Sequence, residues 1–142
     1  MSDPSYIIGT WRSVAHDGEM DKFFTERGIP FPIRKILTLM ADHGEVIFEI
    51  KNNELVETEV GTFKNTVKEG RPLDGTKVPF VAPDGVKGMT YYEFSDGMIK
   101  IIEVVTEDDQ VIHEFKQEGD KVIRKISNSK SGTFFTITLA RK

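Results

Sequence analysis

Short segments in which apolar and polar residues alternate run along much of the chain. Three of them carry apolar residues or histidine on one parity: Val46, Phe48 and Ile50; Val111, His113 and Phe115; and Phe135, Ile137 and Leu139. A period of two is typical of strands that bury one face and leave the other in solvent. We therefore expect these residues to face the interior of a sheet. Residues 98–106 are apolar on both parities, so the pattern does not assign their faces.

Turn-forming sequences separate the segments. Examples are Asp17-Gly18, Asp74-Gly75, Asp96-Gly97 and Gly119-Asp120. Short extended segments between regularly spaced turns favour a meandering, all-β sandwich or barrel.

One region, residues 19–40, has a different period. Its apolar residues recur at spacings of three and four, which is the helical pattern: Met20, Phe23, Phe24, Ile33, Ile36, Leu37 and Met40. Gly28 can end a first helix, and Pro30 can begin a second. The sequence therefore predicts one strand, a helix–turn–helix, and then about nine strands.

This order of elements predicts a barrel. A meander exposes two unpaired edges unless the sheet closes on itself. Ten strands make a closed sheet too wide for its own side chains to fill, so an interior cavity is expected. A helical pair after the first strand is well placed to cover one end. We expect an all-β, ten-stranded antiparallel up-and-down β-barrel with a helical lid, forming a single domain over residues 1–142.

Composition narrows the function. The chain has 142 residues, no cysteine and a net charge of −4, which favours neither a disulfide framework nor nucleic acid as a partner. No apolar run approaches the ~20 residues of a membrane span. Residues 1–5 lack the basic and apolar regions of a secretory signal. We expect a monomer that stays in the cytoplasm, with the nucleus as a second location.

Four stretches, in order along the chain, resemble motifs of the intracellular lipid-binding family of fatty-acid- and retinoid-binding proteins. They are Gly9-Thr10-Trp11-Arg12, residues 27–35 (RGIPFPIRK), Thr62-Phe63-Lys64-Asn65-Thr66, and residues 83–87 (PDGVK). The first resembles the opening strand of the family and the second its helix–turn–helix. The third matches a five-residue motif as it stands, and the fourth resembles a turn before a central strand.

The resemblance implies a lipocalin-like barrel that carries a long-chain fatty acid, a retinoid or a related amphiphile. It also implies entry through a portal at the second helix, where Ile29, Ile33 and Leu37 lie, and beside Phe63. Met20 and Phe24, on the first helix, are further candidate ligand contacts.

The chain differs from the family at the positions that bind the carboxylate of the ligand. Many fatty-acid binders end with Arg-x-Tyr on the last strand, but those places hold Ile137 and Leu139 here. The place of the arginine that helps from an earlier strand holds His113 or Phe115. The usual carboxylate grip is therefore absent, and Ile126 and Phe135 join these residues as candidate cavity wall.

Arg124 is the candidate polar anchor. It alternates with Val122 and Ile126, whereas Lys121 and Lys125 occupy the other parity, so it should point inward. A guanidinium in an apolar cavity requires an anion, water or a carboxylate. It could anchor the head group of a ligand, or it could form an internal salt bridge.

His113 shares the inward parity of Val111 and Phe115. It could donate to a ligand head group, or neighbouring polar side chains could satisfy it. His16, His43 and His113 have no metal-ligand spacing, and the chain contains no cysteine nucleophile and no Gly-x-Ser-x-Gly elbow. We expect no metal, no cofactor and no catalytic residue.

The sequence leaves open three alternatives to the function of a fatty-acid carrier. One is a carrier of retinoids or another lipophile with atypical head-group recognition. Another is a barrel enzyme acting on an apolar substrate, for which His113 and Glu114 are the candidate pair, although strand neighbours point to opposite faces. The third is an interaction protein that has lost its ligand. Arg27, Arg34 and Lys35 could steer the protein to membranes, or they could be ordinary solvated charges.

Overall fold

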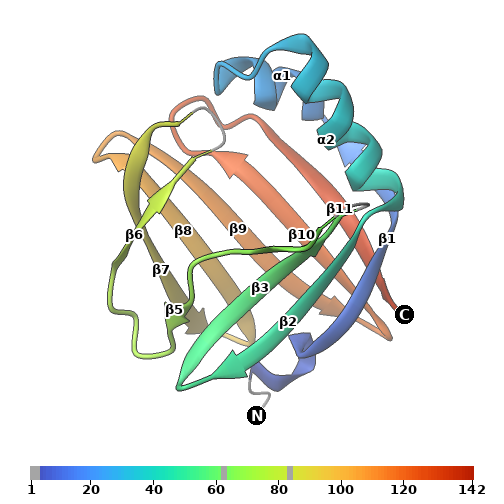
Figure 1. Cartoon of the computed structure of the whole chain (residues 1–142), viewed down its shortest axis with the longest axis vertical. Coiled ribbons are helices and arrows are strands. Elements are labelled where there is room, and N and C mark those ends of the chain that lie inside the picture. Colours follow the sequence, from blue (N-terminus) through green and yellow to red (C-terminus); the bar gives the residue numbers. More distant parts are fainter. Residues whose placement is uncertain (1–3, 62–63, 83–84) are drawn as a thin grey trace.

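The computed structural model describes residues 4–61, 64–82 and 85–142. They form one strongly curled antiparallel sheet with two helices across one end (Figure 1). In chain order the elements are η1 (Pro4–Ile7), β1 (Gly9–Gly18), α1 (Met20–Glu26), α2 (Phe31–His43), β2 (Glu45–Lys51), β3 (Glu54–Val60), β4 (Thr66–Val67), β5 (Arg71–Pro72), β6 (Val78–Val81), β7 (Lys87–Ser95), β8 (Met98–Thr106), β9 (Asp109–Glu118), β10 (Lys121–Asn128) and β11 (Phe134–Arg141).

The strands follow an up-and-down order. From β6 to β11, each strand pairs with the next in the chain, and β1 pairs with both β2 and β11, so the first and last strands are joined. The two short strands β4 and β5 both pair with β3 and act as one interrupted strand. With that pair counted once, the sheet has the ten strands that the sequence predicts, and the all-β fold with helices after the first strand is confirmed.

Between the two ends of this strand order, the described residues leave the backbone ladder of the barrel interrupted. In the residues that the structure describes, the sheet ends at β4 and β5 on one side and at β6 on the other, with no backbone pairing between these edges. Pro72 lies in β5 and Pro79 in β6, and proline has no N–H to donate to a ladder. Near this seam the buried Arg71 of β5 donates from Nε to Oγ1 of Thr90 on β7 at 2.9 Å. A side chain thus spans the region where the ladder stops.

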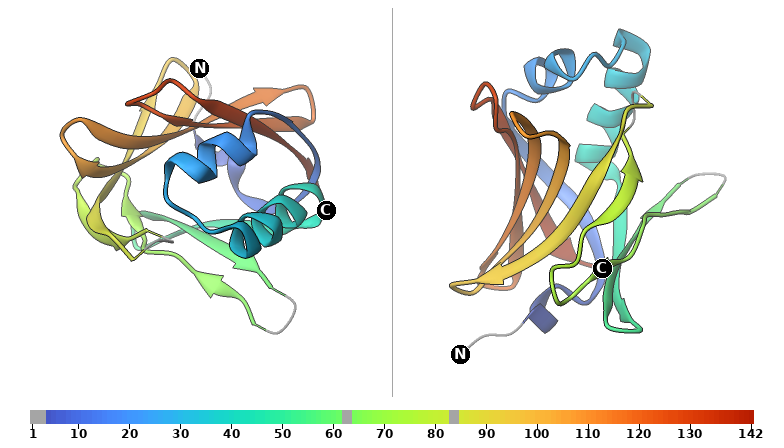
Figure 2. Two further views of the ribbon diagram at one scale, coloured as in Figure 1. Left: turned by 90° about the horizontal axis from the view of Figure 1, so that it is seen from above. Right: turned by 90° about the vertical axis from the view of Figure 1, so that its left-hand side faces the viewer.

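The two helices, α1 and α2, form the lid that the sequence predicts. Seen from above, they lie across the opening of the curled sheet (Figure 2). Gly28 reverses the chain between them with a φ of +75°, in the left-handed region that favours glycine, and Pro30 caps the start of α2. The carboxylate of Glu26 accepts hydrogen bonds from Asn128 at 2.8 Å and Thr133 at 2.9 Å, which ties the end of α1 to the sheet.

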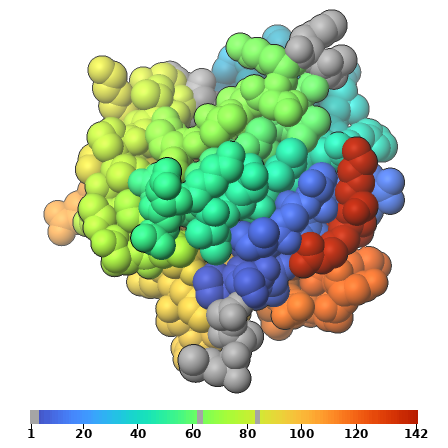
Figure 3. All heavy atoms as spheres, turned by 60° about the horizontal axis from the view of Figure 1, so that its bottom comes forward, coloured from blue at the N-terminus to red at the C-terminus, as the bar shows by residue number. Residues whose placement is uncertain are grey.

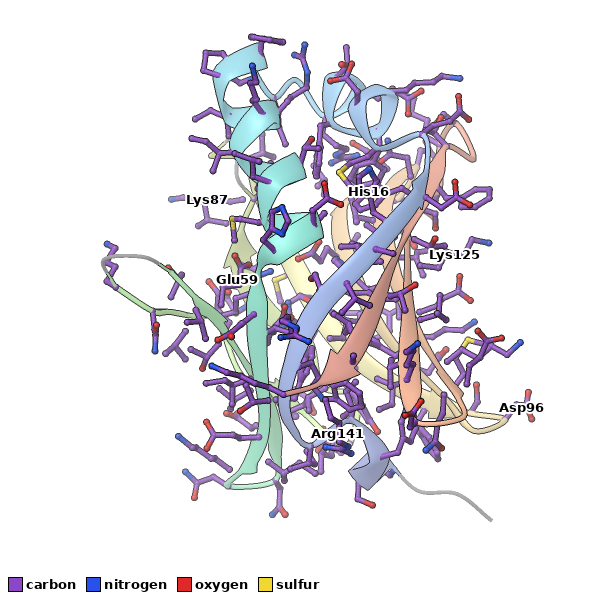
Figure 4. All side chains as sticks on the ribbon, turned by 90° about the vertical axis from the view of Figure 1, so that its right-hand side faces the viewer. His16, Glu59, Lys87, Asp96, Lys125 and Arg141 are labelled. Atoms are coloured by element: carbon purple, nitrogen blue, oxygen red, sulfur yellow. The ribbon has the colours of Figure 1, made fainter. Side chains whose placement is uncertain are left out.

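The opposite end of the barrel is plugged by η1 and the C-terminal strand, which lie together at this end of the molecule (Figure 3). Trp11 is buried and donates from its indole nitrogen to the carbonyl of Ile7 at 2.7 Å. The guanidinium of Arg141 lies 4.3 Å from the centre of the Trp11 ring and donates to the carbonyls of Tyr6 and Ile8, both at 2.9 Å. Figure 4 labels Arg141 at this end.

Candidate functional site

The inward side chains of β9, β10 and β11 form three levels between the lid and the plugged end. Nearest the lid is the upper cluster of buried apolar residues: Met20, Phe23, Ala41, Val111, Ile126 and Phe135. Nearest the plugged end is the lower cluster: Ile7, Trp11, Val46, Phe48, Leu55, Tyr92, Ile99, Ile101, Phe115, Val122 and Leu139. On β9 and β10, His113 and Arg124 fall between the two clusters because inward residues alternate.

The middle level is charged. We call it the polar belt, and it consists of Glu57, Glu59, Lys68, Arg71, Glu103, His113 and Arg124. Buried charges are costly unless they are paired. Each member of the belt has a partner of opposite charge or a hydrogen-bond partner within it, so the belt is an internally compensated network.

A cavity of about 230 Å³ lies inside the barrel. The lid contributes an apolar roof, and the belt contributes charged groups to the wall. The lining residues that carry the argument are Phe23, Phe24, Ile29, Leu37, Met40 and Ala41 from the helical region, and Glu57, Glu59, Lys68, Glu103, Val111, His113, Arg124, Ile126, Phe135, Ile137 and Leu139 from the barrel.

Arg124 lies at the centre of the belt. Its Nη1 donates to Oε2 of Glu57 at 2.9 Å, and its Nη2 donates to Oε1 of the same carboxylate at 3.3 Å, which is a bidentate pair. The guanidinium also stacks 4.9 Å from the centre of the Phe115 ring. The predicted inward orientation is observed, and so is the internal salt bridge that the sequence left as one alternative. Lys125, on the opposite parity, is exposed (Figure 4).

His113 is held in one tautomer by its two neighbours. Arginine only donates, and Arg124 donates to Nδ1 of His113 from Nε at 3.2 Å, so Nδ1 is an acceptor. The ring proton is therefore on Nε2, which lies 3.0 Å from Oε1 of Glu103 and donates to it. Burial and the charge of Arg124 lower the pKa of His113, and they outweigh the charge of Glu103, which acts in the opposite direction. Because its pKa is lowered, the imidazole is neutral at physiological pH.

Glu57 remains ionised although it is almost completely buried, at 2% exposed. Burial by itself would raise its pKa, but the charges of Arg124 and Lys68 outweigh that effect and hold the pKa well below its usual range. The ammonium of Lys68 lies 3.8 Å from Glu57 and 2.7 Å from Glu59. One lysine on the interrupted edge of the sheet therefore joins two carboxylates of β3.

Glu103 joins the belt to the seam of the sheet. Its carboxylate lies 3.7 Å from Nη2 of Arg71, on the far side from His113. Burial opposes ionisation, but His113 and the charges of Lys68 and Arg71 lower the pKa of Glu103 to about 2. The belt thus sets the cations Lys68, Arg71 and Arg124 against three carboxylates and a neutral histidine.

The sequence matches no family model, and no curated protein matches it either. Solved structures do match. Fatty-acid-binding protein 1 of Echinococcus granulosus has a TM-score of 0.81 at 20% identity, with 96% of this chain and 98% of the other covered. Lipid binding protein 8 of Caenorhabditis elegans reaches 0.83 at 17% identity, covering 100% and 99%. The chain has the fold of the fatty-acid-binding proteins. Human cRBP IV shares it, with a TM-score of 0.76, 18% identity and full coverage of both chains.

Within this fatty-acid-binding-protein fold, nine of the predicted site residues line the cavity. They are Phe24, Ile29, Leu37, His113, Arg124, Ile126, Phe135, Ile137 and Leu139. Met20 and Phe115 are buried beside it, in the upper and lower clusters respectively. The remaining two predicted residues are Ile33 and Phe63.

Ile33 is 43% exposed and does not line the cavity. It shares a helical face with Leu37 and Ala41 but lies in the first turn of α2, ahead of the residues that reach the interior. Phe63 lies outside the described residues.

The residues predicted from the sequence do not include the carboxylates of the belt. Glu57 and Glu59 share the parity of the buried Leu55, so the alternation in β3 does indicate that both side chains face inward. His113 and Glu114, the candidate pair of the alternative enzyme, point to opposite faces, as expected of strand neighbours: Glu114 pairs with Lys100 at 3.9 Å, and Glu103 is the carboxylate at His113. In the part of the chain that the structure describes, no group of three or more acidic or histidine side chains is arranged to hold a metal ion, and no helix is long and apolar enough to span a membrane.

Proposed function

We propose that the protein is a carrier of one long-chain fatty acid or related lipid, held in the cavity between the lid and the polar belt. The observation that carries the proposal is a cavity under the lid with mostly apolar walls, Phe24, Leu37 and Ile126 among them, in which most of the charged groups belong to the polar belt. The volume of about 230 Å³ is somewhat below the usual range for ligand pockets, roughly 300–1,000 Å³, so the cavity has room for one ligand at most.

Burial of the apolar tail supplies the affinity. Each methylene removed from water contributes about 0.8 kcal/mol before ordering costs are subtracted. The tail lies against the upper cluster, and the polar belt faces the head group. Two of the similar structures are titled a fatty-acid-binding protein and a lipid binding protein, which supports a lipid as the cargo.

The site supports a carrier better than it supports an enzyme. Both ring nitrogens of His113 are engaged, one by Arg124 and one by Glu103, so the histidine has no free lone pair to accept a proton from a substrate. A retinoid or another lipophile is the closest alternative cargo, since a structure titled cRBP IV has the same fold. We expect the protein to act as a monomer in the cytoplasm and the nucleus.

Transient contact with membranes forms part of the proposal. The outer face of α2 exposes large apolar side chains, with Phe31 at 61% and Leu39 at 58% exposed. The expected basic patch contributes less, because Arg27 pairs with Asp109 and Arg34 pairs with Asp21. Replacing Phe31 and Leu39 by serine should slow the transfer of a fluorescent fatty acid to phosphatidylcholine vesicles. A transfer rate that is unchanged in this variant contradicts membrane contact through α2.

Native mass spectrometry of the purified protein, followed by organic extraction, tests the carrier directly. We expect one lipid per chain. Displacement of Nile red, a neutral apolar dye, then measures binding in solution. Leu37→Trp fills the cavity and should abolish dye binding, whereas Leu39→Trp places the same side chain on the exposed face of the same helix and should not.

Protein that carries no lipid and does not bind Nile red, fatty acids or retinoids would favour a ligand-free interaction protein. Equal dye binding by the two tryptophan variants would place the ligand outside the cavity.

A further inference from the structure

The charges of the polar belt bear on which head group the cavity accepts. Resting on the carrier function proposed above, we propose that the cargo is the related lipid rather than the ionised fatty acid: the ligand presents an uncharged polar head, a hydroxyl or an amide on a long apolar tail, and an ionised carboxylate is disfavoured.

The positive and negative charges of the belt balance. The three cations of the belt are matched by three carboxylates, and none of the cations faces the cavity without an acidic partner. The central cation, Arg124, already holds both oxygens of Glu57 in a bidentate pair. A second carboxylate at this level would add an uncompensated negative charge to a site of low dielectric, which is costly.

A ligand carboxylate would have to compete with Glu57 for Arg124. A fatty-acid carboxylate could pair with the guanidinium only by displacing Glu57, which is 2% exposed and would then be left buried without its main partner. His113 offers no second cation, because it is neutral and donates its one ring proton to Glu103. The belt therefore lacks the free positive charge that a carboxylate requires.

The hydrogen-bonding groups of the belt are complementary to those of a hydroxyl or an amide. The belt presents donors and acceptors side by side, since Lys68 and Arg124 are donors and Glu57, Glu59 and Glu103 are acceptors. A hydroxyl or an amide both donates and accepts, and can join such a network without breaking an ion pair. A carboxylate only accepts, so its oxygens would face the oxygens of Glu57 or Glu103.

Isothermal titration calorimetry at neutral pH with ligands of one tail tests the inference. The ligands are oleate, oleyl alcohol and N-(2-hydroxyethyl)oleamide. We expect the two neutral ligands to bind about tenfold more tightly than oleate, or better. Oleate binding as tightly as the alcohol overturns the head-group inference and leaves the carrier intact. Failure of all three to bind overturns the carrier and the inference together.

A charge-removing variant gives the reverse test. Glu57→Gln keeps the length of the side chain but frees one positive charge, so the affinity for oleate should rise about tenfold relative to that for oleyl alcohol. Glu49→Gln, the same change on an exposed residue of the neighbouring strand, should alter neither. Unchanged oleate binding in Glu57→Gln contradicts the inference.

A second variant covers the case in which Glu57→Gln does not fold. Glu57→Gln combined with Arg124→Gln removes the pair and leaves the belt balanced, so the preference for the alcohol over oleate should persist. Reversal of that preference in the double variant contradicts the argument from charge balance.

Discussion

The two halves of the barrel interior are built on the same strands but do different things. On β9, β10 and β11 the inward residues of both halves are apolar, yet the cavity is lined by five of the six residues of the upper cluster and by only two of the eleven residues of the lower cluster, Val46 and Leu139. The lower half is filled by aromatic side chains and by η1, and Phe48 and Phe115 meet edge to face with their centres 5.4 Å apart. The upper half is roofed by the two helices, whose Phe23, Phe24, Leu37 and Met40 line the cavity. Alternation decides which residues face inward, but side-chain size and the covering elements decide where room for a ligand remains.

The largest expected effect distinguishes the packed half from the hollow half. Phe115→Ala should lower the free energy of unfolding by about 3–5 kcal/mol, because Phe115 is fully buried and its removal leaves a new void. Phe24→Ala borders the existing cavity and is partly exposed, so it should cost about 1 kcal/mol. Urea unfolding measures both. Equal losses would mean that the two halves are packed alike.

Breaking the ion pair between Glu57 and Arg124 in the belt should have the next largest effect on the free energy of unfolding. Arg124→Met leaves Glu57 buried without its bidentate partner and should cost about 3–5 kcal/mol. The double variant Glu57→Leu with Arg124→Met removes both charges and should be more stable than Arg124→Met alone. A double variant whose loss equals the sum of the two single losses would show that the pair is not coupled.

Much of this fold follows from the sequence, and part of the belt does not. The period of two placed Arg124 and His113 inward, and the helical spacing of Met20, Phe23 and Phe24 located the lid. The partner Glu57 lies 67 residues before Arg124, and a local pattern carries no information on which strands face each other across a barrel. In β8 the apolar residues occupy both parities, so nothing marked Glu103 as an inward residue.

Acid should weaken the belt by a smaller amount. The hydrogen bond from His113 and the charges of Lys68 and Arg71 hold the pKa of Glu103 in the folded state below its ordinary value of 4.5, so its contribution to the free energy of unfolding is present above pH 4.5 and is lost as the pH falls below that value. Glu57 acts in the same direction. The lowered pKa of His113 adds a further loss as the pH falls below 6.5.

Urea unfolding at a series of pH values measures this dependence. Glu103→Gln should be less stable than the parent protein at neutral pH and should approach it in acid, because the variant has no carboxylate to protonate. Parallel curves for the two proteins would contradict the role of Glu103.

The smallest effect concerns the roof of the hollow half. Leu37→Ala should weaken Nile red binding about fivefold, equivalent to about 1 kcal/mol of lost apolar contact, with little change in stability. Leu39→Ala changes the same residue type on the exposed side of α2 and should leave binding unaltered. A loss of dye binding in Leu39→Ala would instead place the dye on the outer surface of the lid.

The central claim is that a lipid occupies the cavity under the lid and does not enter the interior of the lower cluster. Isoleucine methyl NMR during a titration with oleyl alcohol tests it in one experiment. The methyl groups of Ile29 and Ile126, which line the cavity, should shift or broaden, whereas those of Ile99 and Ile101, in the lower cluster, should remain in place. Shifts confined to Ile99 and Ile101, or no shifts at saturating alcohol, would contradict the account.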